Sequence, residues 1–322
     1  MNRKIAILGA GTMGAGIAAQ YAMYGHPVCL HSRTQSTLDR ARRTVEKSLA
    51  MLAEEGVLPC ADAATAAALI SYTTQLEQAV EGAWYVVETI VEQKQAKQEL
   101  YDRLDDLLPE GVILASNTSF MDIFAMLPPR RQSHALIVHW FAPAHILPLV
   151  EVIQGEGTSG EVVSQVMEFH RACGKTPVLM ERYVPGFIVN RLQSAMTREV
   201  LYLLENGYCS QEAIDLAVKS SLMPRGLMLG LVQRMDFTGV DMVANGLKNK
   251  TYQPAPPPQP EDQIFAMVER GALGVKSGSG FYSYDHMAYE DILAHRDRQL
   301  LKCVALANEL MENPLHSSDS KS

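Results

Sequence analysis

A histidine and a glutamate near the middle of the sequence have the types and surroundings needed for acid–base chemistry. His139 ends the apolar run Ala135–Val138, and Glu151 lies inside the next apolar run, Leu149–Ile153. A neutral imidazole with one ring nitrogen oriented by a carboxylate can take the proton of an alcohol while hydride leaves for a nicotinamide ring. A single histidine at a strand end is more often only a polar terminus. The pair therefore indicates catalysis only together with further polar groups nearby.

Two other segments supply such polar groups. Ser116-Asn117-Thr118-Ser119 follows an apolar run, and Asn190 lies in Pro185-Gly186-Phe187-Ile188-Val189-Asn190-Arg191. The strand ends on the ligand side of an open α/β sheet are where such groups converge. Each segment also has a plainer explanation, since Ser116–Ser119 suits a helix cap and Asn190 suits a hydrogen-bonded core amide.

The N-terminus carries a glycine pattern for binding a dinucleotide. The apolar run Lys4–Leu8 ends in Gly9-Ala10-Gly11-Thr12-Met13-Gly14, and a helical pattern follows from Ala15 to Met23. In this context Gly9 permits a tight turn, Gly11 lets the backbone approach a pyrophosphate, and Gly14 lets helix and strand pack closely. The amides around Thr12 and Met13 then face the phosphates at a helix N-terminus.

The end of the second predicted strand bears on the choice of cofactor. An NAD-binding domain usually has Asp or Glu there, about 20 residues past the glycines, to bind the ribose 2′-hydroxyl. Here Ser32 and Arg33 occupy this place. A hydroxyl and a guanidinium suit a 2′-phosphate, which favours NADP. The alternative is that Arg33 stacks on adenine and the cofactor is NAD.

Alternating strand and helix patterns predict an α/β fold, a Rossmann-type doubly wound sheet with a second, all-α helical domain. Beyond Pro185 the chain reads as helical, with Leu192, Met196 and Val200 at helical spacing. Those apolar residues indicate core or dimer-interface packing. The expected parts are a nucleotide-binding domain (1–184) with a helical hairpin at about 36–69, a helical substrate and dimerisation domain (185–316), and a disordered tail (317–322).

Composition excludes several functions. The 322-residue chain has a formal charge of −8 and a pI near 5.6, which argues against nucleic acid as a partner. The sequence offers no apolar run long enough for a membrane span and no signal-peptide pattern at its start. Five scattered cysteines without paired histidines argue against a metal site and suit the reducing cytoplasm.

In its motifs the sequence resembles the L-3-hydroxyacyl-CoA dehydrogenase family, including its branch with carnitine dehydrogenase and lambda-crystallin. The resemblance extends to about residue 285. It rests on the glycine motif and on several other segments in the same order: Glu88–Glu92 with Lys97, Ala115–Ser119, His139–Pro143, Leu149–Val152, Pro185–Arg191 and Gly274–Tyr282.

The resemblance implies a role for each matching residue. His139 would be the general acid and base, with Glu151 as its orienting partner. Ser119 and Asn190 would hold the reacting oxygen and the imidazole. The nicotinamide-ribose site would be lined by Glu92, Lys97 and Asn117. The implied reaction interconverts a 3-hydroxy acid, free or as a CoA thioester, and its 3-oxo form, and family members are commonly homodimers.

Three departures from the family bear on the substrate. Trp84 stands where the family usually has Asp, and Ala142 replaces an Asn near the substrate. Glu54 and Glu55 lie where acyl-CoA enzymes carry lysines that meet CoA phosphates, and carboxylates oppose such binding. The segment Ala144–Glu151 looks more like the carnitine dehydrogenase and lambda-crystallin branch, which acts on free 3-hydroxy acids. A free or small acid is therefore favoured over a thioester, without excluding the latter.

Two other functions stay open at this point. A β-hydroxyacid dehydrogenase or imine reductase also joins a Rossmann domain to a helical one, although its catalytic lysine is not apparent in the second half. A cofactor-binding crystallin-like protein without turnover is the non-enzymatic alternative.

Overall fold

The computed structural model describes residues 3–249, 253–257, 259, 262–312 and 315. The chain forms two compact units, Met1–Arg191 and Leu192–Ser322. The segment from Pro185 to Arg191 therefore belongs to the first unit. The tail at 317–322, which we expect to be disordered, lies outside the described residues.

Within its described residues, the first unit contains an eight-stranded sheet in the order β3-β2-β1-β4-β5-β6-β7-β8. Neighbouring strands are parallel except β6 and β7, which pair antiparallel. The central strands are short apolar runs that are fully buried, as expected for a sheet covered on both faces. The strands are β1 (Ile5–Leu8), β2 (Val28–His31), β3 (Ile70–Thr73), β4 (Tyr85–Glu88), β5 (Ile113–Ser116), β6 (Ala135–Trp140), β7 (Leu149–Gln154) and β8 (Thr176–Met180).

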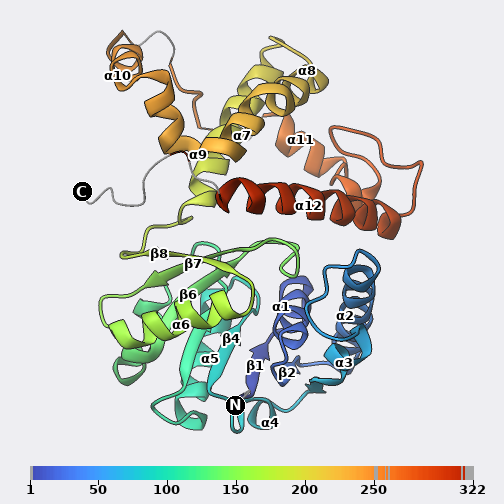
Figure 1. The fold of residues 1–322 in the computed structure, drawn as a ribbon, viewed down its shortest axis with the longest axis vertical. Coiled ribbons are helices and arrows are strands. Elements are labelled where there is room, and N and C mark those ends of the chain that lie inside the picture. The colour runs from blue at the N-terminus through green and yellow to red at the C-terminus, as the bar shows by residue number, and fades with distance from the viewer. Residues whose placement is uncertain (1–2, 250–252, 258, 260–261, 313–314, 316–322) are drawn as a thin grey trace. The chain divides into compact units, whose positions relative to one another are not determined.

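Several helices of the first unit begin where the sequence provides a capping side chain. The Thr34 side chain accepts a hydrogen bond from the Thr37 amide at the start of α2, and Ser159 accepts one from Val162 at the start of α6. The elements are α1 (Thr12–Met23), α2 (Gln35–Glu54), α3 (Ala63–Ala68), α4 (Leu76–Val80), α5 (Lys94–Leu107), α6 (Gly160–Ala172) and the 3-10 turns η1 (Phe124–Met126) and η2 (Pro129–His134) (Figure 1).

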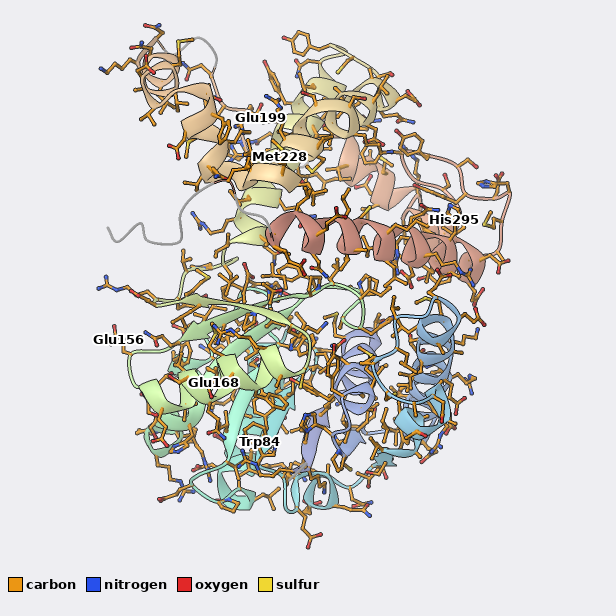
Figure 2. The ribbon with its side chains drawn as sticks, in the orientation of Figure 1. Trp84, Glu156, Glu168, Glu199, Met228 and His295 are labelled. Atoms are coloured by element: carbon orange, nitrogen blue, oxygen red, sulfur yellow. The ribbon has the colours of Figure 1, made fainter. Side chains whose placement is uncertain are left out.

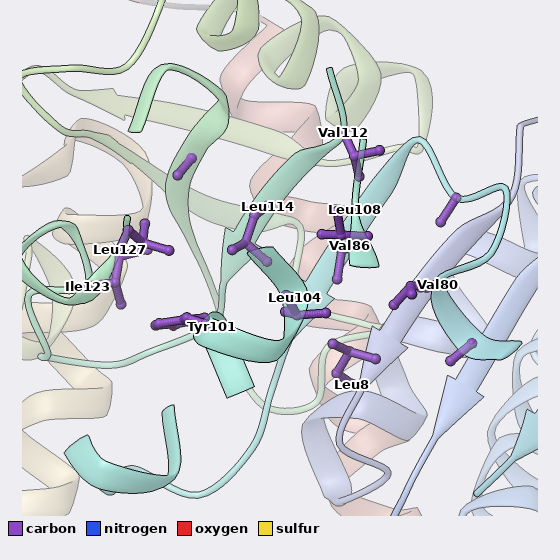
Figure 3. Close-up of a cluster of buried hydrophobic side chains, with 14 of the residues drawn as sticks. Leu8, Val80, Val86, Tyr101, Leu104, Leu108, Val112, Leu114, Ile123 and Leu127 are labelled. Atoms are coloured by element: carbon purple, nitrogen blue, oxygen red, sulfur yellow. The ribbon is translucent and has the colours of Figure 1, made fainter. Parts of the chain in front are cut away.

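The core of the first unit lies between the sheet and its helices. One cluster joins Leu8, Val86 and Leu114 from three neighbouring strands to Tyr101 and Leu104 on α5 (Figure 3). Burial of these side chains stabilises the unit by the hydrophobic effect and fixes α5 against the sheet. The strand ends that carry the polar residues are thereby held in place.

Trp84, one of the departures from the family pattern, packs locally just before β4 (Figure 2). Its ring stacks on Tyr85 with centroids 5.2 Å apart and meets Phe169 edge-on at 5.0 Å. The Arg3 guanidinium lies 4.1 Å above the Trp84 ring. This residue therefore acts in packing.

The second unit is built from helices, which together with the sheet of the first unit confirms the predicted fold class. Few of its apolar side chains are buried; Leu201 and Met267 are among them, whereas Val232 and Leu247 are about three-quarters exposed, at 74% and 75%. Among the described residues, none of the helices is long and apolar enough to cross a membrane. The elements are α7 (Val189–Glu205), α8 (Gln211–Ala217), η3 (Val218–Leu222), α9 (Met223–Thr238), α10 (Val240–Asn249), α11 (Gln263–Glu269), η4 (Val275–Ser277) and α12 (Tyr289–Glu312).

Candidate active site

The glycine turn between β1 and α1 has the geometry that a pyrophosphate requires. Gly9 has φ +113°, and a Cβ there would lie 2.6 Å from the Thr89 carbonyl oxygen. A Cβ on Gly14 would lie 1.8 Å from the Gly9 carbonyl oxygen, so only glycine allows this contact. Gly11 has no heavy atom within 4 Å of its Cβ position, which leaves space above the helix N-terminus. The first amides of α1, from Thr12 onward, are therefore open to an anion.

The end of β2 presents hydroxyls and guanidinium groups. Ser32 follows the strand directly and donates its amide to the Thr73 carbonyl, at 3.3 Å. Arg33 is exposed, and Arg40 on α2 donates to the Thr37 hydroxyl at 3.2 Å. The place where a carboxylate would meet a ribose 2′-hydroxyl is thus polar and lined by cations.

His139 and Glu151 lie directly opposite each other on β6 and β7. The His139 Nδ1 is 2.8 Å from Glu151 Oε2, and both side chains are almost fully buried. The other carboxylate oxygen, Oε1, accepts hydrogen bonds from the Ile188 and Val189 amides at 3.0 and 2.9 Å. A carboxylate held by two amides can only accept from the imidazole, so Nδ1 carries the proton and Nε2 presents a lone pair.

The turn before α7 supplies the two amides that hold Glu151. Gly186 has φ +80°, and Phe187 has φ +51°, a conformation that non-glycine residues rarely adopt. The Phe187 ring is 1% exposed and lies 5.3 Å from the His139 ring. The buried ring holds the strained turn in place, which directs the following amides at the carboxylate. The sequence did not single out Phe187, although its position after Pro185-Gly186 was a usable signal.

Asn117, Ser119 and Asn190 lie at one end of the strands next to this pair. Asn117 Oδ1 accepts from the Trp140 amide at 2.8 Å, which ties the end of β5 to the end of β6. Asn190 Nδ2 donates to the Ser119 carbonyl at 3.4 Å. Ser119 and Asn190 are both partly exposed. The structure thus brings together residues that are distant in sequence and were singled out separately.

Lys97 is buried deeper than a cofactor-lining residue needs to be. Its ammonium group is 1% exposed and donates to both carboxylate oxygens of Glu88, at 2.7 and 2.8 Å. Glu88 also accepts from the hydroxyls of Tyr101, at 2.8 Å, and Ser116, at 2.6 Å. The buried carboxylate is thus fully hydrogen-bonded. The sequence signal for Glu88 was a carboxylate ending an apolar strand, which requires a buried partner.

Glu92 connects this buried pair to the site. Its Oε2 lies 3.5 Å from the Lys97 Nζ and accepts from the Thr118 hydroxyl at 3.0 Å. Its Oε1 accepts from the Ser119 amide at 2.6 Å. Glu92 therefore links the buried Lys97 to the Ser119 turn, whose backbone it fixes.

The residues that bear on the substrate lie on the surface of α2 and after β6. Glu54 and Glu55 are exposed at the C-terminal end of α2. Ala142 follows β6 and precedes a cis peptide bond to Pro143. In the described part of the chain, no group of three or more metal-binding side chains is placed to hold a metal ion.

Comparison with known proteins identifies relatives of this chain. The NAD-binding domain of 3-hydroxyacyl-CoA dehydrogenases matches residues 4–183, and the C-terminal domain of the same enzymes matches residues 186–284. A probable 3-hydroxybutyryl-CoA dehydrogenase of Deinococcus radiodurans is 37% identical over 87% of this chain and 100% of its own length. The mitochondrial hydroxyacyl-coenzyme A dehydrogenase of Homo sapiens is 34% identical over 88% of this chain and 91% of its own.

A solved structure of similar fold is that of 5-formyl-3-hydroxy-2-methylpyridine 4-carboxylic acid 5-dehydrogenase, described as an NAD⁺-dependent dismutase. It has a TM-score of 0.83 and 28% identity and covers 96% of this chain and 99% of its own. These matches support the first of the three functions considered from the sequence. With both halves of the chain matched in order, the protein belongs to the 3-hydroxyacyl-CoA dehydrogenase family of NAD-dependent oxidoreductases.

Proposed function

We propose that this protein interconverts a 3-hydroxy acid and its 3-oxo form, with His139 as general acid and base. The observation that carries the proposal is the buried 2.8 Å contact between His139 Nδ1 and Glu151 Oε2. It fixes the tautomer in which Nε2 is the nitrogen that accepts a proton. His139 and the glycine turn lie at the carboxyl ends of parallel strands of one sheet. This supports the proposal, because ligands of open α/β sheets bind at that edge.

In the oxidative direction, His139 Nε2 takes the proton of the 3-hydroxyl group as the C3–O double bond forms. The hydride on C3 leaves at the same time, and bound NAD(P)⁺ supplies its acceptor. Glu151 stabilises the imidazolium through the bond to Nδ1. In reduction the imidazolium donates its proton to the C3 carbonyl oxygen, which gains negative charge as hydride adds to C3.

The surrounding residues orient the reacting groups. We propose that Ser119 and Asn190 hold the substrate oxygen and the imidazole, since both lie near the pair and are partly exposed. Glu92 and Asn117 would line the nicotinamide-ribose side, with Lys97 behind Glu92. The fit of the cofactor rests on Gly11, where the space at the Cβ position is open.

We further propose that the cofactor is NADP(H). Ser32 and the exposed Arg33 stand where a carboxylate would otherwise repel a 2′-phosphate. Arg40, on the first turns of α2, adds a second guanidinium near this strand end. Guanidinium groups bind phosphate oxygens in a planar, bidentate geometry.

We propose a free or small 3-hydroxy acid as substrate. The exposed Glu54 and Glu55 oppose a phosphate group at the end of α2, where CoA enzymes of the family carry lysines. The relative with the TM-score of 0.83 has a carboxylic acid as its named substrate, whereas other relatives are named for CoA thioesters.

Loss of either member of the catalytic pair should abolish most of the activity. His139→Ala and Glu151→Gln should each lower kcat by at least about 100-fold, since acid–base groups contribute about 10²–10⁴-fold. Cofactor Kd, measured by fluorescence titration, should stay unchanged. His134→Ala, a matched histidine removal outside the site, should retain activity. A loss of less than tenfold in both pair variants removes the pair from the mechanism.

The cofactor preference has a direct kinetic test. We expect kcat/KM to be higher with NADP⁺ than with NAD⁺, and Ser32→Asp should reverse the order, because a carboxylate repels the 2′-phosphate and accepts from a 2′-hydroxyl. Arg33→Ala should weaken the binding of NADP⁺ and leave that of NAD⁺ unchanged. A wild-type ratio below one contradicts the NADP(H) assignment.

The substrate class is tested with matched pairs of free 3-hydroxy acids and their CoA thioesters. The free acids should have the higher kcat/KM, and the double variant Glu54→Lys/Glu55→Lys should raise kcat/KM for the thioesters only, because it places cations near the CoA phosphates. Thioesters preferred by the wild type would overturn the free-acid assignment.

We also propose that the protein is a homodimer paired through its second unit. Val232, Phe237 and Leu247 are more than 60% exposed on α9 and α10, and exposed apolar side chains of this density mark an interaction surface. Sedimentation equilibrium should give twice the chain mass of 35.5 kDa. Val232→Asp/Leu247→Asp should give the mass of one chain. A wild-type protein with the mass of one chain excludes the dimer.

A further inference from the structure

A buried lysine outside the catalytic pair holds the turn that joins the two catalytic strands. Lys175 precedes β8 and is 5% exposed. Its Nζ donates to the Ala144 carbonyl at 2.6 Å and to the Leu147 carbonyl at 2.9 Å. Both carbonyls belong to the segment between β6, which carries His139, and β7, which carries Glu151. One ammonium group therefore fixes two points of this connection.

The same ammonium group lies against Trp140, the last residue of β6. Its Nζ is 4.9 Å from the centre of the indole ring, within the range of a cation–π contact. Trp140 is buried and directly follows His139. The lysine thus contacts both the end of the histidine strand and the turn that follows it.

The turn itself is compact and is packed closely on α1. The Pro143 carbonyl accepts from the Ile146 and Leu147 amides at 3.1 and 3.0 Å. A Cβ on Gly16 of α1 would lie 3.2 Å from the Ala144 Cβ, so the turn sits directly on this helix. A turn held between α1 and Lys175 has little freedom to move, and β6 ends and β7 begins at this turn.

A buried lysine without a carboxylate partner is costly. In the described part of the chain, the recorded hydrogen bonds of the Lys175 side chain go only to the two carbonyls. Burial lowers the pKa of Lys175 to about 7, which the Cys173 thiol only partly offsets. A methionine would fill similar space without this penalty. The cost of burying the Lys175 charge is explained if the ammonium group positions the turn, because an apolar side chain could not donate to the two carbonyls.

We propose that Lys175 is a positioning residue for the reaction, which fixes the turn between the His139 and Glu151 strands through the Ala144 and Leu147 carbonyls. The inference rests on the proposed function of that pair. Without the two bonds, both carbonyls lose their buried partner, and the turn and strand ends relax. The imidazole then shifts relative to the substrate, and displacements of about 1 Å cost up to about 100-fold in rate.

Burial shifts the pKa values of several groups around Lys175 away from neutrality, which helps to make its own titration observable. Burial lowers the pKa of His170 on α6 to about 4 and raises that of Cys173 to about 12. The tyrosines on the packed elements, Tyr21 and Tyr24 of α1 and Tyr85 of β4, have pKa values raised by burial. His139 on β6 and His145 on the turn are two further titratable side chains, which are tested by substitution.

The first test uses the emission of Trp140 without any substrate. The sequence has two tryptophans, so Trp84→Phe leaves Trp140 as the sole emitter. Its emission should change with a midpoint near pH 7 as the adjacent ammonium group loses its charge. Lys175→Met in this background should abolish the midpoint and shift the emission to the red, since a displaced turn admits water. His139→Gln and His145→Gln should keep the midpoint. A midpoint that survives Lys175→Met overturns the assignment.

The second test separates positioning from stability. Lys175→Met should lower kcat by about 10- to 100-fold and leave the cofactor Kd within about twofold. Arg131→Met is the control, because Arg131 is also a buried cation that donates to backbone carbonyls, those of Leu108 and Pro109, away from the pair. It differs from Lys175 in that it also pairs with the Asp105 carboxylate, at 2.9 Å. Arg131→Met should lower the melting temperature and leave kcat unchanged.

The outcomes separate this inference from the proposed function. An unchanged kcat in Lys175→Met, or an equal loss in Arg131→Met, overturns the positioning role. A wild-type protein without turnover on any 3-hydroxy acid overturns the proposed function instead. In that case the red shift of Trp140 emission at pH 6 still decides whether Lys175 holds the turn: its presence supports that role and its absence refutes it.

Discussion

The hydrogen bond between His139 and Glu151 across β6 and β7 is the interaction on which the site depends. It requires the antiparallel pairing of these strands, in which the two residues lie directly opposite. A slip of one residue would turn one of the two side chains to the other face of the sheet. Three features bear on the placement of His139 and Glu151. They are the strand pairing, the amides of Ile188 and Val189, and the hydrogen bonds of Lys175. The geometry of the His139–Glu151 pair is therefore a property of the first unit as a whole.

A second set of charges holds the neighbouring wall of the site. Glu88 and Lys97 form a buried pair in which the Lys97 ammonium donates to both Glu88 oxygens. These oxygens also accept from two hydroxyls and a backbone amide. Pairs of this kind add little net stability, because the cost of desolvation offsets the attraction. Here the pair positions other groups: Lys97 lies 3.5 Å from Glu92, and Glu92 accepts a hydrogen bond from the Ser119 amide. Charge buried in the core thus sets the backbone at the surface.

Much of the fold was predictable from the sequence, because local patterns agree with it. The strand before the glycine motif and the helix after it follow directly from an apolar run and from helical spacing. β3 and β8 are not predicted by the sequence pattern, since Ile70–Thr73 is half polar and Thr176–Met180 contains a proline. Such strands form because neighbouring strands offer them hydrogen bonds, and no local pattern reports this.

The candidate site, too, was predictable from the sequence only in part. Motifs identified His139, Glu151, Ser119 and Asn190, but not how they are held. The turn strain at Phe187 and the clamp at Lys175 depend on contacts between segments far apart in the chain. Lys97 shows the opposite case: its sequence position suggested the cofactor, and only the fold shows its partner Glu88.

The tautomer of His139 tests the central claim most directly. Nitrogen-15 NMR is measured at a pH where His139 is uncharged, with its signal assigned by comparison with His139→Gln. The spectrum then reports which ring nitrogen carries the proton. The geometry predicts a protonated Nδ1 and an unprotonated Nε2 in the wild type, and loss of this preference in Glu151→Gln. A proton on Nε2 in the wild type would contradict the account, because that nitrogen would then have no lone pair for the substrate hydroxyl.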